Sequence, residues 1–117
     1  MKQGDIVTIC FPYTNHKDAK RRPALVISNE KYNFGKEILL VGISTKNNIP
    51  RLSRVLTNED LKHGSLLRQS YVKFTNIMSF EKHLIIKKIG SIKAGKLRQI
   101  LGQFKSFLTT PSPRTSG

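Results

Sequence analysis

The stretch that decides the fold of this chain is Arg22-Pro23-Ala24-Leu25-Val26-Ile27. A cation runs into a proline and then into an unbroken apolar segment. Proline fixes its own φ and favours extended geometry in the residue before it, so Arg22 is expected at the junction of a loop and a strand. The apolar run that follows is typical of a central strand of a sheet.

Further short strands are predicted on both sides of this one. Alternation and β-branched residues favour strands over residues 5–13, 37–45, 54–57, 70–77 and 83–89. Polar loops are predicted at residues 14–22 and 46–53, a turn at 29–36 and one helical turn at 58–61. Gly64 and Gly90 are expected to end the elements that precede them. Several short strands joined by turns favour a small, strongly bent β-barrel, so the chain is expected to be mainly β.

One helix is predicted near the C-terminus. Apolar side chains recur there at three- and four-residue steps, at Leu97, Ile100, Leu101, Phe104 and Leu108. From Thr109 onward the composition turns to Thr, Ser and Pro, which is typical of a disordered tail. We therefore expect one domain over residues 1–108 and a tail over residues 109–117.

The charge of the chain indicates a polyanionic partner. Lysine and arginine number 21 against 7 acidic residues, which gives a net charge of +14. A merely solvated basic surface is one alternative. A membrane surface is another, but the cations are scattered and do not follow one amphipathic helix.

The remaining composition favours a cytoplasmic protein. A single cysteine, Cys10, excludes an intrachain disulfide and fits a reducing compartment. No apolar run approaches the ~18 residues of a membrane span, and the amino terminus lacks the apolar core of a signal peptide. We expect no association with a membrane.

Metal catalysis has little support in the sequence. His16, His63 and His83 are far apart, no Cys-x-x-Cys spacing occurs, and the seven acids are spread over the chain. No cofactor motif is visible either. Metal-free cleavage of RNA is compatible with the residues, because the 2′-hydroxyl of RNA is a nucleophile within the substrate.

Four residues are candidates for such chemistry. Arg22 has a planar fork of donors that suits a phosphate, and it could stabilise charge in the transition state. Ser44 and Thr45, at the end of a predicted strand, could hold a phosphate oxygen. His16, in the first basic loop, has an ordinary pKa suited to proton transfer. Each has a plainer interpretation: a surface arginine, a turn cap and a solvated histidine.

The chain resembles the PemK/MazF family of toxin endoribonucleases. The resemblance rests on blocks in matching order: Gly4-Asp5-Ile6-Val7, Phe11-Pro12-Tyr13-Thr14, residues 22–28, Ile43-Ser44-Thr45, Gly64-Ser65-Leu66-Leu67, Ser70-Tyr71-Val72-Lys73 and Lys88-Ile89-Gly90. They cover roughly residues 2–108. Each block is weak alone, and their combination is fairly specific.

The resemblance implies a fold, an activity and partners. It implies an SH3-like β-barrel with a C-terminal helix, usually a homodimer, that cuts single-stranded RNA at short sequences without a metal. It also implies a small acidic antitoxin and, for the toxin–antitoxin complex, operator DNA. The antitoxin tail is expected across the basic loops 14–22 and 46–53, over the same cations as the RNA.

Site residues carry over one by one. The family's arginine before proline falls on Arg22, and its strand-end threonine falls on Ser44, with Thr45 adjacent. His16 stands at a spacing where some members carry a histidine implicated in catalysis. The cations expected to hold RNA are Lys17, Lys20, Arg21, Lys46, Arg51 and Lys73.

Two departures from the family pattern leave the general base open. Thr75 stands where some members have an aspartate, and Lys17-Asp18 stands where others have a glutamate. A nucleic-acid-binding SH3-like module without catalysis, including one directed to DNA, is therefore a second hypothesis. A peptide-binding adaptor is a weaker third.

Overall fold

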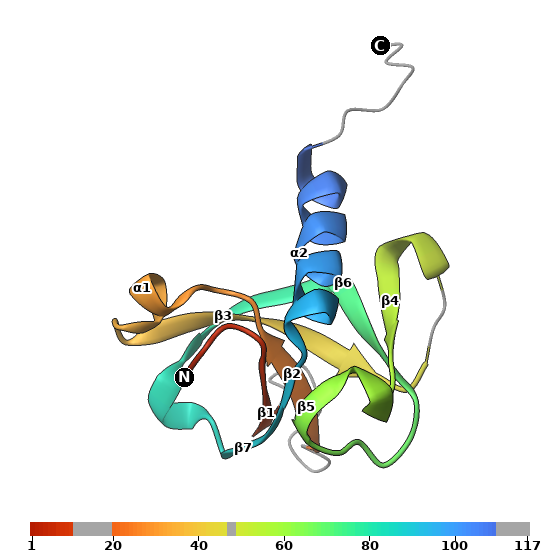
Figure 1. Ribbon diagram of the computed structural model, residues 1–117. Coiled ribbons are helices and arrows are strands. Elements are labelled where there is room, and N and C mark those ends of the chain that lie inside the picture. The colour runs from red at the N-terminus through yellow and green to blue at the C-terminus, as the bar shows by residue number, and fades with distance from the viewer. Residues whose placement is uncertain (11–19, 47–48, 110–117) are drawn as a thin grey trace.

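The chain folds into one strongly curled antiparallel sheet with a helix standing on it (Figure 1). The computed structural model describes residues 1–10, 20–46 and 49–109. Its strands are β1 (Asp5–Cys10), β2 (Arg21–Val26), β3 (Glu37–Ser44), β4 (Ser53–Leu56), β5 (Leu61–Gly64), β6 (Ser70–Glu81) and β7 (Lys87–Ile92). The helical elements are α1 (Glu30–Asn33), η2 (Pro50–Leu52), η3 (Asn58–Asp60), η4 (Lys82–Leu84) and α2 (Ala94–Thr109).

The sheet forms a half-barrel with the strand order β4-β6-β3-β2-β1-β7-β5. The long strand β6 pairs with both β3 and β4, and its register on β3 shifts between Val41 and Ile43. Such an irregularity bends a strand and increases its twist, which lets β6 turn from one side of the half-barrel to the other. The prediction of a bent, mainly β, SH3-like fold with a C-terminal helix is confirmed.

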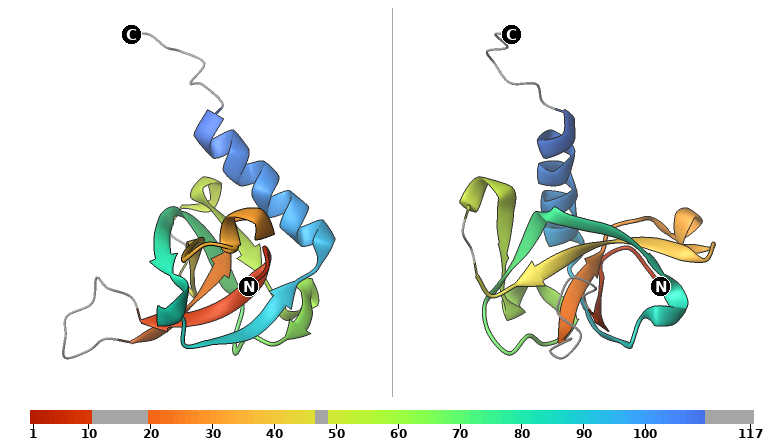
Figure 2. Two further views of the ribbon diagram at one scale, coloured as in Figure 1. Left: turned by 90° about the vertical axis from the view of Figure 1, so that its left-hand side faces the viewer. Right: turned by 180° about the vertical axis from the view of Figure 1, so that it is seen from behind.

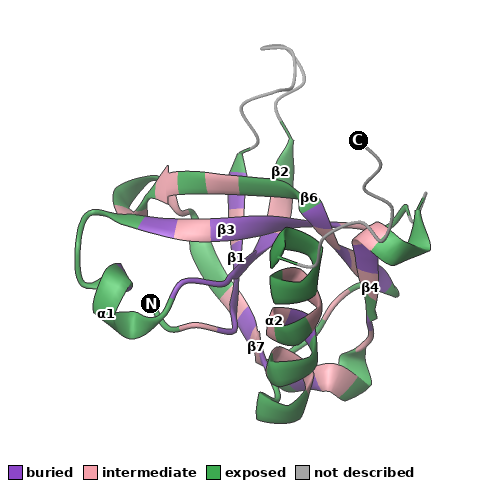
Figure 3. Cartoon of the chain, turned by 90° about the horizontal axis from the view of Figure 1, so that it is seen from above, coloured by how far each residue is buried: buried purple, intermediate pink, exposed green. Residues whose placement is uncertain are grey.

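Apolar side chains cover both faces of the central strands. Leu25 and Val41 belong to the cluster inside the half-barrel, whereas Ala24, Val26 and Leu40 belong to a second cluster on the opposite face. Figure 3 shows this burial along β3. A strand that is buried on both faces needs a continuous apolar sequence, and this is why the residues after Pro23 do not alternate.

Helix α2 closes the inner cluster with its apolar face. Ile100 is fully buried there, with Leu97 and Leu101 packed against the same cluster. Arg54 on β4 donates hydrogen bonds to the side-chain oxygens of Gln103 (2.9 Å) and Gln99 (3.2 Å), which tie the helix to the sheet. In its carboxyl-terminal half, Phe104 and Phe107 lie against Phe74 of β6, with ring centroids 5.8 and 6.4 Å from that ring, and the last residues of the helix point away from the sheet (Figure 2).

Several element boundaries differ from the predicted ones. Strand β2 begins at Arg21, so Arg22 lies within the strand and pairs with Ile9. Strand β5, the short helix α1 and the extension of β6 to Glu81 were not predicted. The last strand covers Lys87–Ile92 instead of residues 83–89. Residues 110–117 lie outside the described residues, and Thr109 is the last residue of α2.

Gly90 lies inside β7 and does not end it. Its missing side chain allows β5 to pack closely against β7 at this point. Gly90 pairs with Gly64 at the end of β5, where φ is +82°. A Cβ on Gly64 would stand 2.1 Å from the carbonyl oxygen of Ile89, and one on Gly90 would stand 2.7 Å from that of His63. The two glycines therefore allow β5 and β7 to approach closely. No helix of the described residues is long and apolar enough to cross a membrane.

Candidate active site

The candidate site lies where β2 and β3 separate. The two strands pair at Ala24 with Gly42, Leu25 with Val41 and Val26 with Leu40. Continuing this register would place Arg22 opposite Ser44 and Arg21 opposite Thr45. The ladder ends before those residues, at the irregularity where β3 changes its register on β6. A hollow opens between the two strand ends in place of the missing pairs.

This hollow has two adjoining parts. The inner part, of about 220 Å³, is lined by Lys20, Arg21, Arg22, Pro23, Ile43, Ser44, Thr45 and Ser70. The outer part, of about 270 Å³, is lined by Thr8, Arg21, Arg22, Pro23, Thr45, Ser65, Leu66, Leu67, Arg68, Ser70 and Ile89. Arg21, Arg22 and Thr45 line both parts, so both belong to one site.

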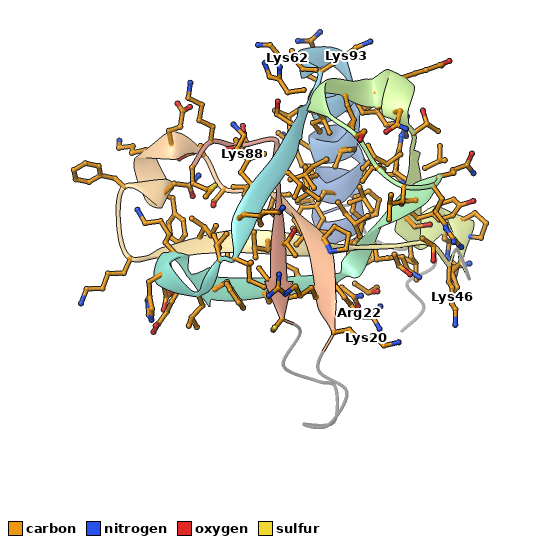
Figure 4. All side chains as sticks on the ribbon, turned by 90° about the horizontal axis from the view of Figure 1, so that it is seen from below. Lys20, Arg22, Lys46, Lys62, Lys88 and Lys93 are labelled. Carbon is orange, nitrogen blue, oxygen red and sulfur yellow. The ribbon has the colours of Figure 1, made fainter. Side chains whose placement is uncertain are left out.

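Five residues that the sequence singled out are brought together here. Lys20, Arg21, Arg22, Ser44 and Thr45 all line the inner part of the hollow. Arg22 is half-buried, whereas Lys20 and Arg21 are exposed. Figure 4 shows Lys20 and Arg22 next to each other at the start of β2. The extended geometry that Pro23 favours for Arg22 is the geometry of a strand residue.

The two hydroxyls at the end of β3 have different surroundings. The Ser44 hydroxyl oxygen accepts a hydrogen bond of 3.0 Å from the backbone N–H of Lys46, which is the turn-capping role anticipated as its plainer interpretation. Thr45 is exposed and lines both parts of the hollow. Because Ser44 lines the inner part alone and Thr45 lines both parts, Thr45 is better placed of the two to contact a ligand.

The other predicted RNA-binding cations lie beside the hollow rather than in its lining. The ammonium group of Lys73, on β6, donates to the carbonyl oxygen of Lys46 at 3.2 Å, so these two cations are neighbours. Arg51 is exposed on η2, two residues before Ser53, which pairs with Lys73. His16 and Lys17 lie outside the described residues, so their predicted roles stay predictions.

Four polar residues of the hollow were not singled out as site residues. Thr8 comes from β1, Ser65 and Arg68 come from the segment between β5 and β6, and Ser70 is the first residue of β6. Ser65 and Ser70 stand within the family-like blocks, which were the only signal in the sequence. The segment that begins at Ser65 is positioned by the contact of Gly64 with Gly90, and these two glycines are far apart in the chain.

The charge of the hollow is uniformly positive. Lys20, Arg21, Arg22 and Arg68 line it, and the described residues of its lining include no carboxylate. Guanidinium groups with hydroxyls at short range bind phosphate oxygens well. In the described ranges, no three His, Cys, Asp or Glu side chains gather as a metal site would require.

Comparison with known proteins identifies relatives of this chain. Residues 2–108 match a family described as PemK-like, MazF-like toxin of type II toxin–antitoxin system. No curated protein matches the sequence.

Solved structures share the fold at low sequence identity. The chain is similar to a chain of a MazE–MazF structure from Deinococcus radiodurans, with a TM-score of 0.74, 20% identity, and 95% of this chain and 97% of that chain covered. It is also similar to an endoribonuclease in complex with its cognate antitoxin from a mycobacterial species, with a TM-score of 0.73, 19% identity and 97% of both chains covered.

Proposed function

Because the chain belongs to the PemK-like, MazF-like toxin family of type II toxin–antitoxin systems, we propose that it cuts single-stranded RNA in the hollow between β2 and β3. The observation that carries this proposal is the convergence of Arg21, Arg22 and Thr45 on one cationic hollow. Solved structures of the same fold include proteins named endoribonucleases, which supports the proposal. The reaction belongs in the cytoplasm, where the substrate is found.

The proposed reaction uses the substrate's own nucleophile. The 2′-oxygen attacks the adjacent phosphorus, the bond from phosphorus to the 5′-oxygen breaks, and the products are a 2′,3′-cyclic phosphate and a 5′-hydroxyl. A base removes the proton of the 2′-hydroxyl and an acid protonates the leaving oxygen. No metal or cofactor is required for this step.

The proposed roles are divided among the lining of the hollow, the cations beside it and two residues outside the described ranges. Arg22 stabilises the charge that builds on the phosphate oxygens, the kind of contribution that is usually the largest in catalysis. Thr45 holds a phosphate oxygen, and Ser44 caps the turn next to it. His16 is proposed to transfer a proton. Lys17, Lys20, Arg21, Lys46, Arg51 and Lys73 bind the phosphates on both sides of the cut.

Protein partners belong to the same proposal. Structures of this fold include toxins with their antitoxins, and we propose that an acidic antitoxin covers the cations of the hollow. A homodimer is supported by exposed apolar side chains on β4 and α2, namely Val55, Phe107 and Leu108. Operator DNA is proposed as a ligand of the toxin–antitoxin complex.

The activity is tested with a long RNA in the presence of EDTA. We expect cuts at one short recurring sequence, each leaving a 5′-hydroxyl and a cyclic phosphate. An RNA with 2′-deoxyribose at the cut position should bind and stay intact. Binding of the unmodified RNA without any cleavage would instead favour the non-catalytic nucleic-acid module. Thr75, which stands where some members of the family have an aspartate, favours that alternative. Cleavage that requires a divalent metal would contradict the mechanism.

A further inference from the structure

The segment between β5 and β6, residues 65–69, forms one wall of the outer part of the hollow. Asn58 on η3 holds this segment through both ends of its amide: its oxygen accepts from the backbone N–H of Leu66 at 2.6 Å, and its nitrogen donates to the carbonyl oxygen of Leu66 at 3.1 Å. The hydroxyl of Ser70 donates to the carbonyl oxygen of Arg68 at 3.0 Å. The wall is therefore held at both of its ends.

The close contact of β5 with β7 fixes the point from which the wall starts. Gly64 precedes Ser65, and its backbone lies against Ile89 and Gly90 with no room for a side chain. Ile89 also lines the outer part of the hollow. One backbone contact thus positions both Ser65 and Ile89 in the lining of this part, which favours a preformed site over one that assembles with its ligand.

Leu67 projects from this wall with its side chain fully in water, at a relative exposure of 104%. Single exposed leucines are common on protein surfaces, but this one stands on a segment held by hydrogen bonds and lines a hollow. Leu66, Pro23 and Ile89 add further apolar surface to the same part. The outer part therefore combines an apolar lining with arginines from both sides, Arg21 and Arg22 on one and Arg68 on the other.

This combination matches the chemistry of one nucleotide. A nucleobase offers flat apolar faces and a polar edge, and a phosphate lies on either side of it along the strand. A volume of about 270 Å³ equals roughly nine water molecules at liquid density, which leaves room for a base. The hydroxyls of Thr8, Ser65 and Ser70 are short polar groups of the kind that contact a base edge.

We propose that the outer part of the hollow receives one base of the RNA, next to the phosphate that is cut, and that Leu67 covers a face of that base. Arg68 binds the phosphate on the far side of the same nucleotide. Leu67 is then a specificity-determining residue, because it acts on one base position and leaves the chemistry at Arg22 unchanged. This inference rests on the proposed function for the identity of the polymer.

The test is an abasic scan, which does not depend on cleavage. The probe is a short oligonucleotide selected for tight binding, with 2′-deoxyribose throughout so that it cannot be cut, and a single abasic site moved along it. In the wild-type protein, one abasic position should lower affinity about tenfold, the scale of one lost base contact. In Leu67→Ser, the penalty at that position should largely vanish, and penalties elsewhere should persist.

Leu84→Ser is the matched control. Leu84 is also an exposed leucine, at 52%, on η4. It follows the end of β6 where Glu81 pairs with Glu37, at the opposite end of β3 from Ser44. This variant should keep the wild-type pattern of penalties at every position.

The outcomes separate this inference from the proposed function. An unchanged penalty at every position in Leu67→Ser would overturn the base site, even if the protein cuts RNA. If the penalty is lost in Leu67→Ser, the base site is supported. If the wild-type protein also binds RNA without cutting it, the proposed activity is overturned while the base site stands. If the protein does cut, sequencing of the products should show relaxed preference at that one position in Leu67→Ser.

Discussion

At the scale of single residues, Ser44 and Thr45 are neighbours at the end of β3, but their hydroxyl groups have different surroundings. Ser44 caps the turn through Lys46, and Thr45 lies one residue further, in the lining of both parts of the hollow. Sequence alone left the phosphate-binding role open between them. The structure distinguishes them, because Thr45 lines both parts of the hollow, whereas Ser44 lines the inner part alone and also caps the turn.

Substitution of the two hydroxyls should therefore have different effects. Thr45→Val should slow cleavage by about 10²-fold, the scale for loss of one group that binds a developing oxyanion, with stability nearly unchanged. Ser44→Ala should lower the free energy of unfolding by about 1 kcal/mol, the net value of one hydrogen bond, and cut RNA at close to the wild-type rate. Single-turnover cleavage and urea unfolding measure the two effects. A larger loss of rate in Ser44→Ala than in Thr45→Val would reverse the assignment.

The local sequence was sufficient to predict the position of those site residues that depend only on their neighbours in the chain. Pro23 makes Arg22 extended, and the apolar run after it makes β2 central, so both were predictable. Arg68 and Ser65 could not be assigned to the site, because their position depends on the contact between Gly64 and Gly90, which are 26 positions apart. His16 and Lys17 lie outside the described residues, and their roles stay predictions.

At the scale of elements, β5 shows why a residue pattern can fail to predict a strand. Its exposed residues, Lys62 and His63, give no apolar alternation, and it pairs with β7 alone as the last strand of the sheet. Gly64 was interpreted correctly as the end of an element, but Gly90 was interpreted in the same way and lies within β7. Its absent side chain serves packing between strands, which no local pattern reveals.

Gly64→Ala tests this contact. The new Cβ would clash with the carbonyl oxygen of Ile89, at a φ of +82°, so we expect a loss of at least about 2 kcal/mol in the free energy of unfolding. Gly102→Ala is the control: Gly102 lies within α2, and a Cβ there meets no atom within 4 Å. That variant should be neutral or up to about 1 kcal/mol more stable. Equal stability of Gly64→Ala and wild type in urea would show that β5 and β7 can move apart freely.

At the scale of the whole molecule, the net charge of +14 attracts both RNA and an acidic protein partner. Both ligands are proposed to occupy the cations around the hollow, so each should exclude the other. Binding of each should weaken steeply with salt, because phosphates and carboxylates are neutralised by the same side chains.

Charge reversal can locate this shared surface. Lys20→Glu should weaken the binding of both a non-cleavable RNA and the antitoxin, and Arg51→Glu should do the same. Lys62→Glu changes the net charge equally, but Lys62 lies on the opposite side of the molecule from Lys20 (Figure 4), so its effect should be much smaller. Competition binding by fluorescence anisotropy measures these effects. Simultaneous binding of RNA and antitoxin would mean that the antitoxin inhibits from a distance.

The central claim, that the hollow around Arg22 is the site of RNA cleavage, is tested most directly by one rate. That rate is single-turnover cleavage of a defined oligonucleotide by Arg22→Ala, with Arg21→Ala as its neighbour in the same hollow. We predict that Arg22→Ala cuts about 10²-fold or more slowly than wild type at saturating protein, while it stays folded and binds RNA. Arg21→Ala should mainly weaken binding and lower its salt dependence. A wild-type rate in Arg22→Ala, or equal losses in the two variants, would contradict the account.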